Sequence, residues 1–374
     1  NLPNYRVRMP RVYPDGSRRD FLRPFHVVYF PKESWALLHF DAKALVFARR
    51  EEKVILSAAR RCLTSTRKGQ DPLLFWKMGR GTSKTNMPYS SLELHVIGVP
   101  AAIAEALLII VADGIAEDAG LPKRVVMLNS MGTSDSSNRY LRDIGTFLRK
   151  HMESIAPALR PRATEDPLGT LIQLIDRGHP GTHRAPQSME YLTEEERRRF
   201  WELLEYVEAF GLPYELNPHI LGSREFWAHS LFELHIQDTE TNTRIPIAWG
   251  GRYDPLAARI AGIHTPSAMI AITFEQRGRL KNISSRETAP IVFFAHLGGE
   301  ARRKTLSVLE TLRRAQIPVR QSVMHERMGE QMAIAERMRV PYLLIMGHKE
   351  AVEGTVLFRE VATNAQRAIP ADEL

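Results

Sequence analysis

The spacing of apolar residues changes along the chain and predicts two kinds of structure. Between residues 73 and 275, short stretches alternate apolar and polar positions, as in Leu92-Glu93-Leu94-His95-Val96, which is typical of half-buried strands. Longer stretches with apolar residues three or four positions apart predict helices. The strands expected are Leu73–Met78, Ser91–Ile97, Val125–Leu128, Leu231–Gln237, Thr243–Trp249 and Ala268–Phe274, and the helices are Ala101–Ala119, Asn138–Met152, Leu168–Ile175 and Thr193–Phe210. Paired strands with helices between them predict an α+β fold built on an antiparallel sheet.

The C-terminal part follows a different pattern, in which single strands alternate with helices. Its expected strands are Ile291–Ala295, Val319–Val323, Tyr342–Met346 and Gly354–Val361, and its helices are Glu300–Ala315 and Met328–Met338. This order predicts a small α/β domain with its own core. We therefore expect a core domain over residues 1–284, with a helical insertion at about 155–212, and a C-terminal domain over 288–374.

Composition narrows the class of protein. The 374 residues are 44% hydrophobic and 25% charged, and they include only one cysteine, Cys62. These values are typical of a soluble globular protein, exclude a disulfide framework, and make a reducing, cytoplasmic compartment the expectation. No apolar run is long enough to span a membrane. The net charge of +8 is concentrated in residues 1–70, which fits either a polyanionic partner or a solvated basic face. The run Arg197-Arg198-Arg199 is interpreted as a solvated face.

The segment Gly250-Gly251-Arg252-Tyr253-Asp254 combines several groups that bind ligands. Two glycines permit a tight turn or a close approach of the backbone to a ligand, and we expect a turn here. Arg, Tyr and Asp then supply a fork of donors, an aromatic face and a carboxylate. A purely structural turn and a ligand site both fit the segment.

Two carboxylates and four histidines are further candidates for site residues. Glu93 and Glu233 lie on strands expected in one sheet, where they could contact a ligand amine or be exposed strand residues. The spacing of the four histidines in the C-terminal third is not that of metal ligands, so no metal site is expected there. They are His264, His296, His325 and His348.

Several motifs, in the right order from about Leu22 to Leu374, resemble the histidyl-tRNA synthetase family of class II aminoacyl-tRNA synthetases. Residues 250–254 resemble the family's Gly-Gly-Arg-Tyr-Asp segment, and Pro266–Glu275 resembles the motif 3 strand that follows it. The remaining matches are Asp166-Pro167-Leu168, Ile175-Asp176 and Ala185-Pro186 in the insertion, Tyr214-Glu215-Leu216-Asn217-Pro218 at its exit, and Met328-Gly329-Glu330-Gln331-Met332, Ala335-Glu336, Ile345-Met346-Gly347, Thr363 and Gln366 in the anticodon-binding-like domain.

The resemblance implies a class II sheet core, a C-terminal anticodon-binding-like domain, and ATP- and Mg²⁺-dependent activation of histidine followed by transfer to tRNA. Cations must stabilise the charge on the transferred phosphate, and the fork of an arginine suits this role. The candidate catalytic residues are therefore Arg80, Arg224 and Arg277. The candidate ligand-binding residues are Glu93, Phe226, Trp227, Glu233, Gly250, Gly251, Arg252, Tyr253 and Asp254.

The chain departs from the family pattern at these arginines. Only Arg80, in a shortened loop, matches the motif 2 arginine. The histidine-specific segment has Gly222 in place of its arginine, with Arg224 nearby, and Phe226 and Trp227 in place of two tyrosines. After Glu275 the motif 3 arginine is displaced by one residue to Arg277, and a shift of one residue on a strand points a side chain to the opposite face.

These departures leave three hypotheses for function. The first is a paralogue with a degenerate aminoacylation site that binds tRNA or a partner protein. The second is an active histidine–tRNA ligase. The third is a regulatory subunit of ATP phosphoribosyltransferase in histidine biosynthesis, although that class generally lacks an anticodon-type domain. Histidine, another small ligand or no ligand at all would each fit the core. A homodimer or a partner protein is expected, because dimers are the family's habit. Only 21 residues precede Leu22-Arg23-Pro24, so the usual dimer helix is not assigned.

Overall fold

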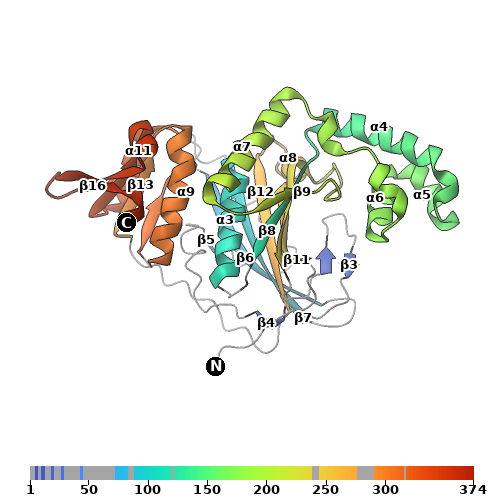
Figure 1. Ribbon diagram of the computed structural model, residues 1–374, viewed down its shortest axis with the longest axis horizontal. Coiled ribbons are helices and arrows are strands. Elements are labelled where there is room, and N and C mark those ends of the chain that lie inside the picture. The colour runs from blue at the N-terminus through green and yellow to red at the C-terminus, as the bar shows by residue number, and fades with distance from the viewer. Residues whose placement is uncertain are drawn as a thin grey trace.

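Two sheets carry most of the fold (Figure 1). The computed structural model describes residues 5–6, 10–12, 18–20, 27–28, 43–44, 72–82, 88–118, 121, 123–237, 244–275, 290–315 and 317–374. The larger sheet has ten strands and the sheet of the C-terminal domain has five. A separate two-stranded pair is formed by β2 (Pro10–Val12) and β3 (Arg18–Asp20).

The large sheet is mainly antiparallel. Its principal order is β5 (Lys43–Ala44), β6 (Leu73–Thr82), β7 (Pro88–Ile97), β12 (Ser267–Glu275), β11 (Arg244–Arg252), β10 (Ala228–Gln237), β8 (Arg124–Ser130) and β9 (Tyr214–Leu216), while β1 (Tyr5–Arg6) pairs with β12 and with β4 (Val27–Val28). Only the β5–β6 and β8–β9 pairs are parallel among these strands. The α+β prediction is confirmed.

Helices cover one face of this sheet and form a separate group at one end (Figure 1). The helices of this part are α3 (Ile103–Asp118), α4 (Ser134–Lys150), α5 (Arg160–Glu165), α6 (Pro167–Asp176), α7 (Glu194–Phe210) and α8 (Asp254–Ala261), and the 3-10 helices are η1 (Met152–Ser154), η2 (Pro157–Leu159), η3 (Pro180–Arg184) and η4 (Ser188–Tyr191). Helix α3 packs against the sheet and α7 packs against α3, whereas α4, α5 and α6 pack against one another. Helix α3 buries residues on all sides because it lies between the sheet and α7.

The C-terminal domain contains a mixed five-stranded sheet. Its elements are β13 (Val292–His296), α9 (Gly299–Arg314), β14 (Val319–Gln321), α10 (Met328–Met338), β15 (Tyr342–Met346), α11 (His348–Glu353), β16 (Thr355–Glu360), β17 (Gln366–Pro370) and η5 (Ala371–Glu373). Strands β14, β13 and β15 are parallel, and β16 and β17 add antiparallel strands. The predicted alternation of strands and helices is confirmed, although the sequence reading missed α11 and β17.

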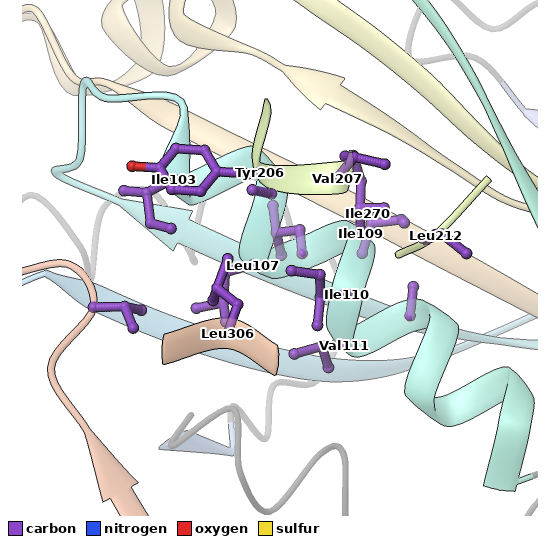
Figure 2. Close-up of a cluster of buried hydrophobic side chains, with 14 of the residues drawn as sticks. Ile103, Leu107, Ile109, Ile110, Val111, Tyr206, Val207, Leu212, Ile270 and Leu306 are labelled. Atoms are coloured by element: carbon purple, nitrogen blue, oxygen red, sulfur yellow. The ribbon is translucent and has the colours of Figure 1, made fainter. Parts of the chain in front are cut away.

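The core of the C-terminal domain is shared with the large sheet's helices. Helix α9 packs against α7, and Leu306 of α9 lies beside Leu107, Ile110 and Val111 of α3 in one continuous buried cluster (Figure 2). A smaller cluster on the other face of the domain includes Phe293 and packs under α10. The expectation of an independent core is therefore wrong, because one face of this sheet is covered from outside the domain.

Two local predictions around the expected site are also wrong. The segment Gly250–Gly251 is not a turn, because β11 runs through both glycines to Arg252. The shortened loop that was expected to carry Arg80 does not include this residue, because β6 extends to Thr82. Arg80 therefore lies in a strand, in register with Ser90 of β7.

Candidate ligand site on the large sheet

The two glycines before Arg252 are required by close packing between strands. A Cβ atom on Gly250 would lie 2.2 Å from the carbonyl oxygen of Met269 and 2.6 Å from the ring of Phe232. On Gly251 it would lie 2.7 Å from Leu231 Cδ2. Both distances are far below van der Waals contact, so this part of β11 admits only glycine.

Arg252 lies at the end of β11, where its side chain enters the core and pairs with Glu105 in the first turn of α3. Its Nη2 donates to Glu105 Oε2 at 2.6 Å and its Nε donates to Glu105 Oε1 at 3.0 Å. Its Nη1 donates to the carbonyl oxygen of Val99 at 3.0 Å. The arginine is only 1% exposed, so its guanidinium is fully used inside the protein.

Glu105 also receives two further hydrogen bonds. Arg199 of α7 donates to it at 2.7 Å and the Ser230 hydroxyl donates at 2.9 Å. Burial alone raises the pKa of this carboxyl, but the charges of Arg252 and Arg199 outweigh burial and lower the pKa from 4.5 to about 2. The interpretation of Arg197–Arg199 as a solvated face is wrong for Arg199, which is half-buried and ion-paired.

Tyr253 and Asp254, which follow β11, form hydrogen bonds with residues of neighbouring strands. Asp254 Oδ1 accepts a hydrogen bond from the Ser267 backbone at 2.6 Å, and burial raises the pKa of this carboxyl. The Tyr253 hydroxyl lies 3.0 Å from Nδ1 of His95 on β7, and burial raises the pKa of that phenol. Both side chains therefore have partners within the protein.

The sheet brings Glu93, Trp249 and Glu233 into one row across its strands. Glu93 is in register with Ala271, Ala271 with Trp249, and Trp249 with Glu233. Residues in register point to the same face of a sheet. The two carboxylates thus share a face of the sheet in which their strands were expected, and Trp249 lies on a strand between theirs.

Each of the two carboxylates in this row lies close to a histidine of its own strand. Glu233 is 2% exposed and its Oε2 lies 2.8 Å from His235 Nε2. Glu93 Oε2 lies 3.5 Å from His95 Nε2. His95 and His235 were not singled out from the sequence, although each stands two residues after its glutamate and therefore on the same face of its strand.

In the segment after β9, where the family resemblance gives an arginine, the side chains contact other residues of the protein. A Cβ atom on Gly222 would lie 2.4 Å from Trp227 Cδ1, and Trp227 meets Trp249 edge to face with ring centres 6.0 Å apart. The Arg224 guanidinium donates instead to the Asn138 side chain on α4. Phe226 is covered by the Arg259 guanidinium, 5.3 Å from its ring centre.

Arg80 and Arg277 are the other two candidate catalytic arginines. The structure gives the strand position of Arg80, whereas Arg277 lies outside the described residues. Within the described ranges, no group of three or more His, Cys, Asp or Glu side chains could hold a metal ion. No helix among the described residues is long and apolar enough to cross a membrane.

The antiparallel sheet backed by α3 and α7, with the buried Arg252 pair at one strand end, defines a class II synthetase-type core. A search against protein families matches residues 292–374 to the anticodon binding domain family. Histidine–tRNA ligase of Cyanothece sp. is 28% identical over 289 residues, which cover 76% of this chain and 67% of that protein. The enzyme of Fervidobacterium nodosum is 28% identical over 292 residues, which cover 77% and 68%. Over about three quarters of its length the chain is therefore similar to histidine–tRNA ligases.

The fold agrees with this assignment. The apo histidyl-tRNA synthetase of S. aureus superposes with a TM-score of 0.51 and 16% identity, over 90% of this chain and 91% of that one. The α+β core and the C-terminal anticodon-binding domain expected from the sequence are therefore both present.

Proposed function

We propose that this chain is a histidyl-tRNA synthetase paralogue whose aminoacylation site is degenerate and which acts by binding tRNA or a partner protein. The observation that carries the proposal is the contact of Gly222 with Trp227. Gly222 stands where the family resemblance gives an arginine, and a side chain there would meet the Trp227 ring at 2.4 Å. An arginine at this position would therefore require the Trp227 indole to move.

Two of the arginines weighed as site residues are engaged with other side chains. Arg224, the nearest candidate in sequence, is engaged with Asn138. Arg252 is engaged with Glu105, and the sheet face beside it carries the pair Glu233–His235. ATP with Mg²⁺ brings a triphosphate whose developing charge needs such cations, so these contacts favour a core that does not activate histidine.

The C-terminal domain supports a role in binding. Its sequence matches the anticodon binding domain family over residues 292–374, which makes tRNA the first partner to test. The same domain counts against a regulatory subunit of ATP phosphoribosyltransferase, because that class generally lacks it. Homodimer formation is the expected mode of assembly.

Pyrophosphate exchange with ATP, Mg²⁺ and histidine separates this proposal from an active ligase. We expect no histidine-dependent exchange. Clear exchange would overturn the proposal, and the alternative of a ligase that uses Arg80, Arg224 and Arg277 would then be tested by replacing each arginine with glutamine. Copurification with a short-form ATP phosphoribosyltransferase, with restored activity, would instead support the regulatory alternative.

Binding to tRNA has its own test. We expect the full chain to retain tRNA in a filter-binding assay at low salt, with affinity falling steeply between 50 and 200 mM salt because phosphate contacts release counterions. Retention that does not respond to salt, or no retention at all, would leave a protein partner as the remaining role of the paralogue.

A further inference from the structure

A pocket lies among the helices of the insertion, between α4, α6, η3 and the segment after β9. Its cavity volume is about 20 Å³, which is room for about one water molecule or one ion, and it is partly open to solvent. Leu171, Ile175 and Leu221 form apolar walls, and polar side chains gather at the rim. An apolar pocket with a few converging polar groups is the usual form of a binding site.

Three polar side chains of this pocket have no hydrogen-bond partner among the described residues: Tyr140, His183 and His219. Tyr140 is 1% exposed and only its ring contact with Tyr191 is formed. Buried polar groups in native proteins are normally satisfied. Of the three residues, Tyr140 is buried, His219 is half-buried and His183 is exposed, so a ligand or water at the opening is the partner left for their polar atoms.

The two imidazoles are spaced as two ligands of one metal ion would be. The ring centres of His183 and His219 lie 5.9 Å apart and the rings are tilted by 52°. A metal–nitrogen bond of about 2.0 to 2.1 Å places each ring centre roughly 3 Å from the ion, so two rings on one ion have centres about 5 to 6 Å apart. We propose that His183 and His219 bind one divalent transition-metal ion, with water or the Gln187 side chain completing its coordination.

The chemistry of the pocket favours a borderline metal over a hard cation or an anion. Neutral imidazole suits Cu²⁺, Ni²⁺ and Zn²⁺, whereas Mg²⁺ and Ca²⁺ prefer carboxylate oxygens, and no carboxylate lines this pocket. Burial, and next the charge of His183, lower the pKa of His219. A lowered pKa favours the neutral ring, which is the form of histidine that binds a metal ion.

Copper titration of the full chain tests this site. We expect one Cu²⁺ per chain, bound by two nitrogens in the electron paramagnetic resonance spectrum, and weaker binding of Ni²⁺ and then Co²⁺. His183→Ala and His219→Ala should each lower the Cu²⁺ affinity at least tenfold and remove one nitrogen from the spectrum. His183 is exposed, so His183→Gln gives a second variant that preserves folding.

The chain has 13 histidines, so a matched control is needed. His264 is exposed and lies outside the pocket, and His264→Ala should bind Cu²⁺ as the unmodified chain does. The proposal is overturned if both pocket variants keep the affinity and the two-nitrogen spectrum, or if the unmodified chain binds no more Cu²⁺ than the double variant.

Discussion

The carboxylate of Glu105 holds two guanidinium groups inside the core, so its charge is essential to the fold. With Arg252 and Glu105 each about 1% exposed, replacing the glutamate leaves a buried positive charge without its partner. We predict that Glu105→Gln lowers the free energy of unfolding by about 3 to 5 kcal/mol, measured by urea titration. Glu194→Gln, an exposed glutamate of α7, should change it by less than about 0.5 kcal/mol; equal effects would refute the assignment.

The same residue predicts a pH dependence. The folded-state pKa of about 2 lies below the ordinary 4.5, so ionised Glu105 stabilises the protein fully above about pH 4.5. This contribution is lost as the pH falls from 4.5 through 2. Unfolding midpoints measured across this range should fall less in Glu105→Gln than in the unmodified chain, and parallel curves would contradict the prediction.

Gly250 is predicted to be intolerant of any side chain. In Gly250→Ala the new methyl group would overlap the Met269 carbonyl and the Phe232 ring, which should cost at least about 2 kcal/mol. Gly329→Ala is the matched control, because a Cβ there meets nothing within 4 Å in helix α10 and alanine favours helices by up to about 1 kcal/mol. Thermal unfolding of the two variants should therefore shift in opposite directions.

At the scale of elements, Glu196 joins the start of α7 to the start of α4. It completes a capping box with Thr193, and it also accepts hydrogen bonds from the Thr133 backbone and the Ser136 hydroxyl, each at 2.6 Å. These bonds outweigh the effect of burial and lower the pKa of Glu196 to about 2. One side chain therefore caps two helix starts that lie 60 residues apart in sequence.

We predict that Glu196→Ala exposes both helix starts. The loss of cap hydrogen bonds should cost about 1 to 3 kcal/mol, and amide hydrogen exchange should accelerate in the first turns of α4 and α7 together. Glu195→Ala, on the exposed side of the same turn, is the control. Faster exchange in α7 alone would mean that Glu196 does not hold α4.

The sequence could predict elements better than it could predict their contacts. The alternation at Leu92–Val96 and the helical spacing from Thr193 to Phe210 are local signals, and each predicts an element that the structure contains. The glycine pair at Gly250 predicts a turn from local sequence alone. The close packing of Met269 and Phe232 that requires glycine in this strand leaves no local signal. The role of Glu105 could not be predicted because its partner Arg252 is 147 residues away, although an acidic residue within the apolar run Ile103–Ala112 is a signal for a buried pair.

At the scale of the whole molecule, the C-terminal domain is joined to the core by packing and by charge. Leu306 packs on α3 (Figure 2). At the other end of α9, Arg313 and Arg314 pair with Glu117 of α3, and Arg303 pairs with Glu205 of α7 at 3.0 Å. Helix α3 therefore carries the Arg252 partner at its first turn and a contact to α9 at its last turn.

This arrangement predicts one cooperative unfolding transition for both parts. Leu306→Ala should lower the stability of the whole described structure by about 2 to 5 kcal/mol, measured by calorimetry. Val352→Ala, whose side chain is exposed, should leave the transition unchanged. Two separate transitions, with only the second one affected by Leu306→Ala, would contradict the shared core.

The central claim is that this synthetase-type fold lacks the arginines needed to activate histidine, although it contains the buried Arg252–Glu105 pair. The most direct measurement is ATP–pyrophosphate exchange with Mg²⁺, with and without histidine, beside the related histidine–tRNA ligase of Fervidobacterium nodosum as an active control. We predict the same background exchange from this chain with and without histidine. Exchange that rises with histidine and saturates, as in the control enzyme, would contradict the account.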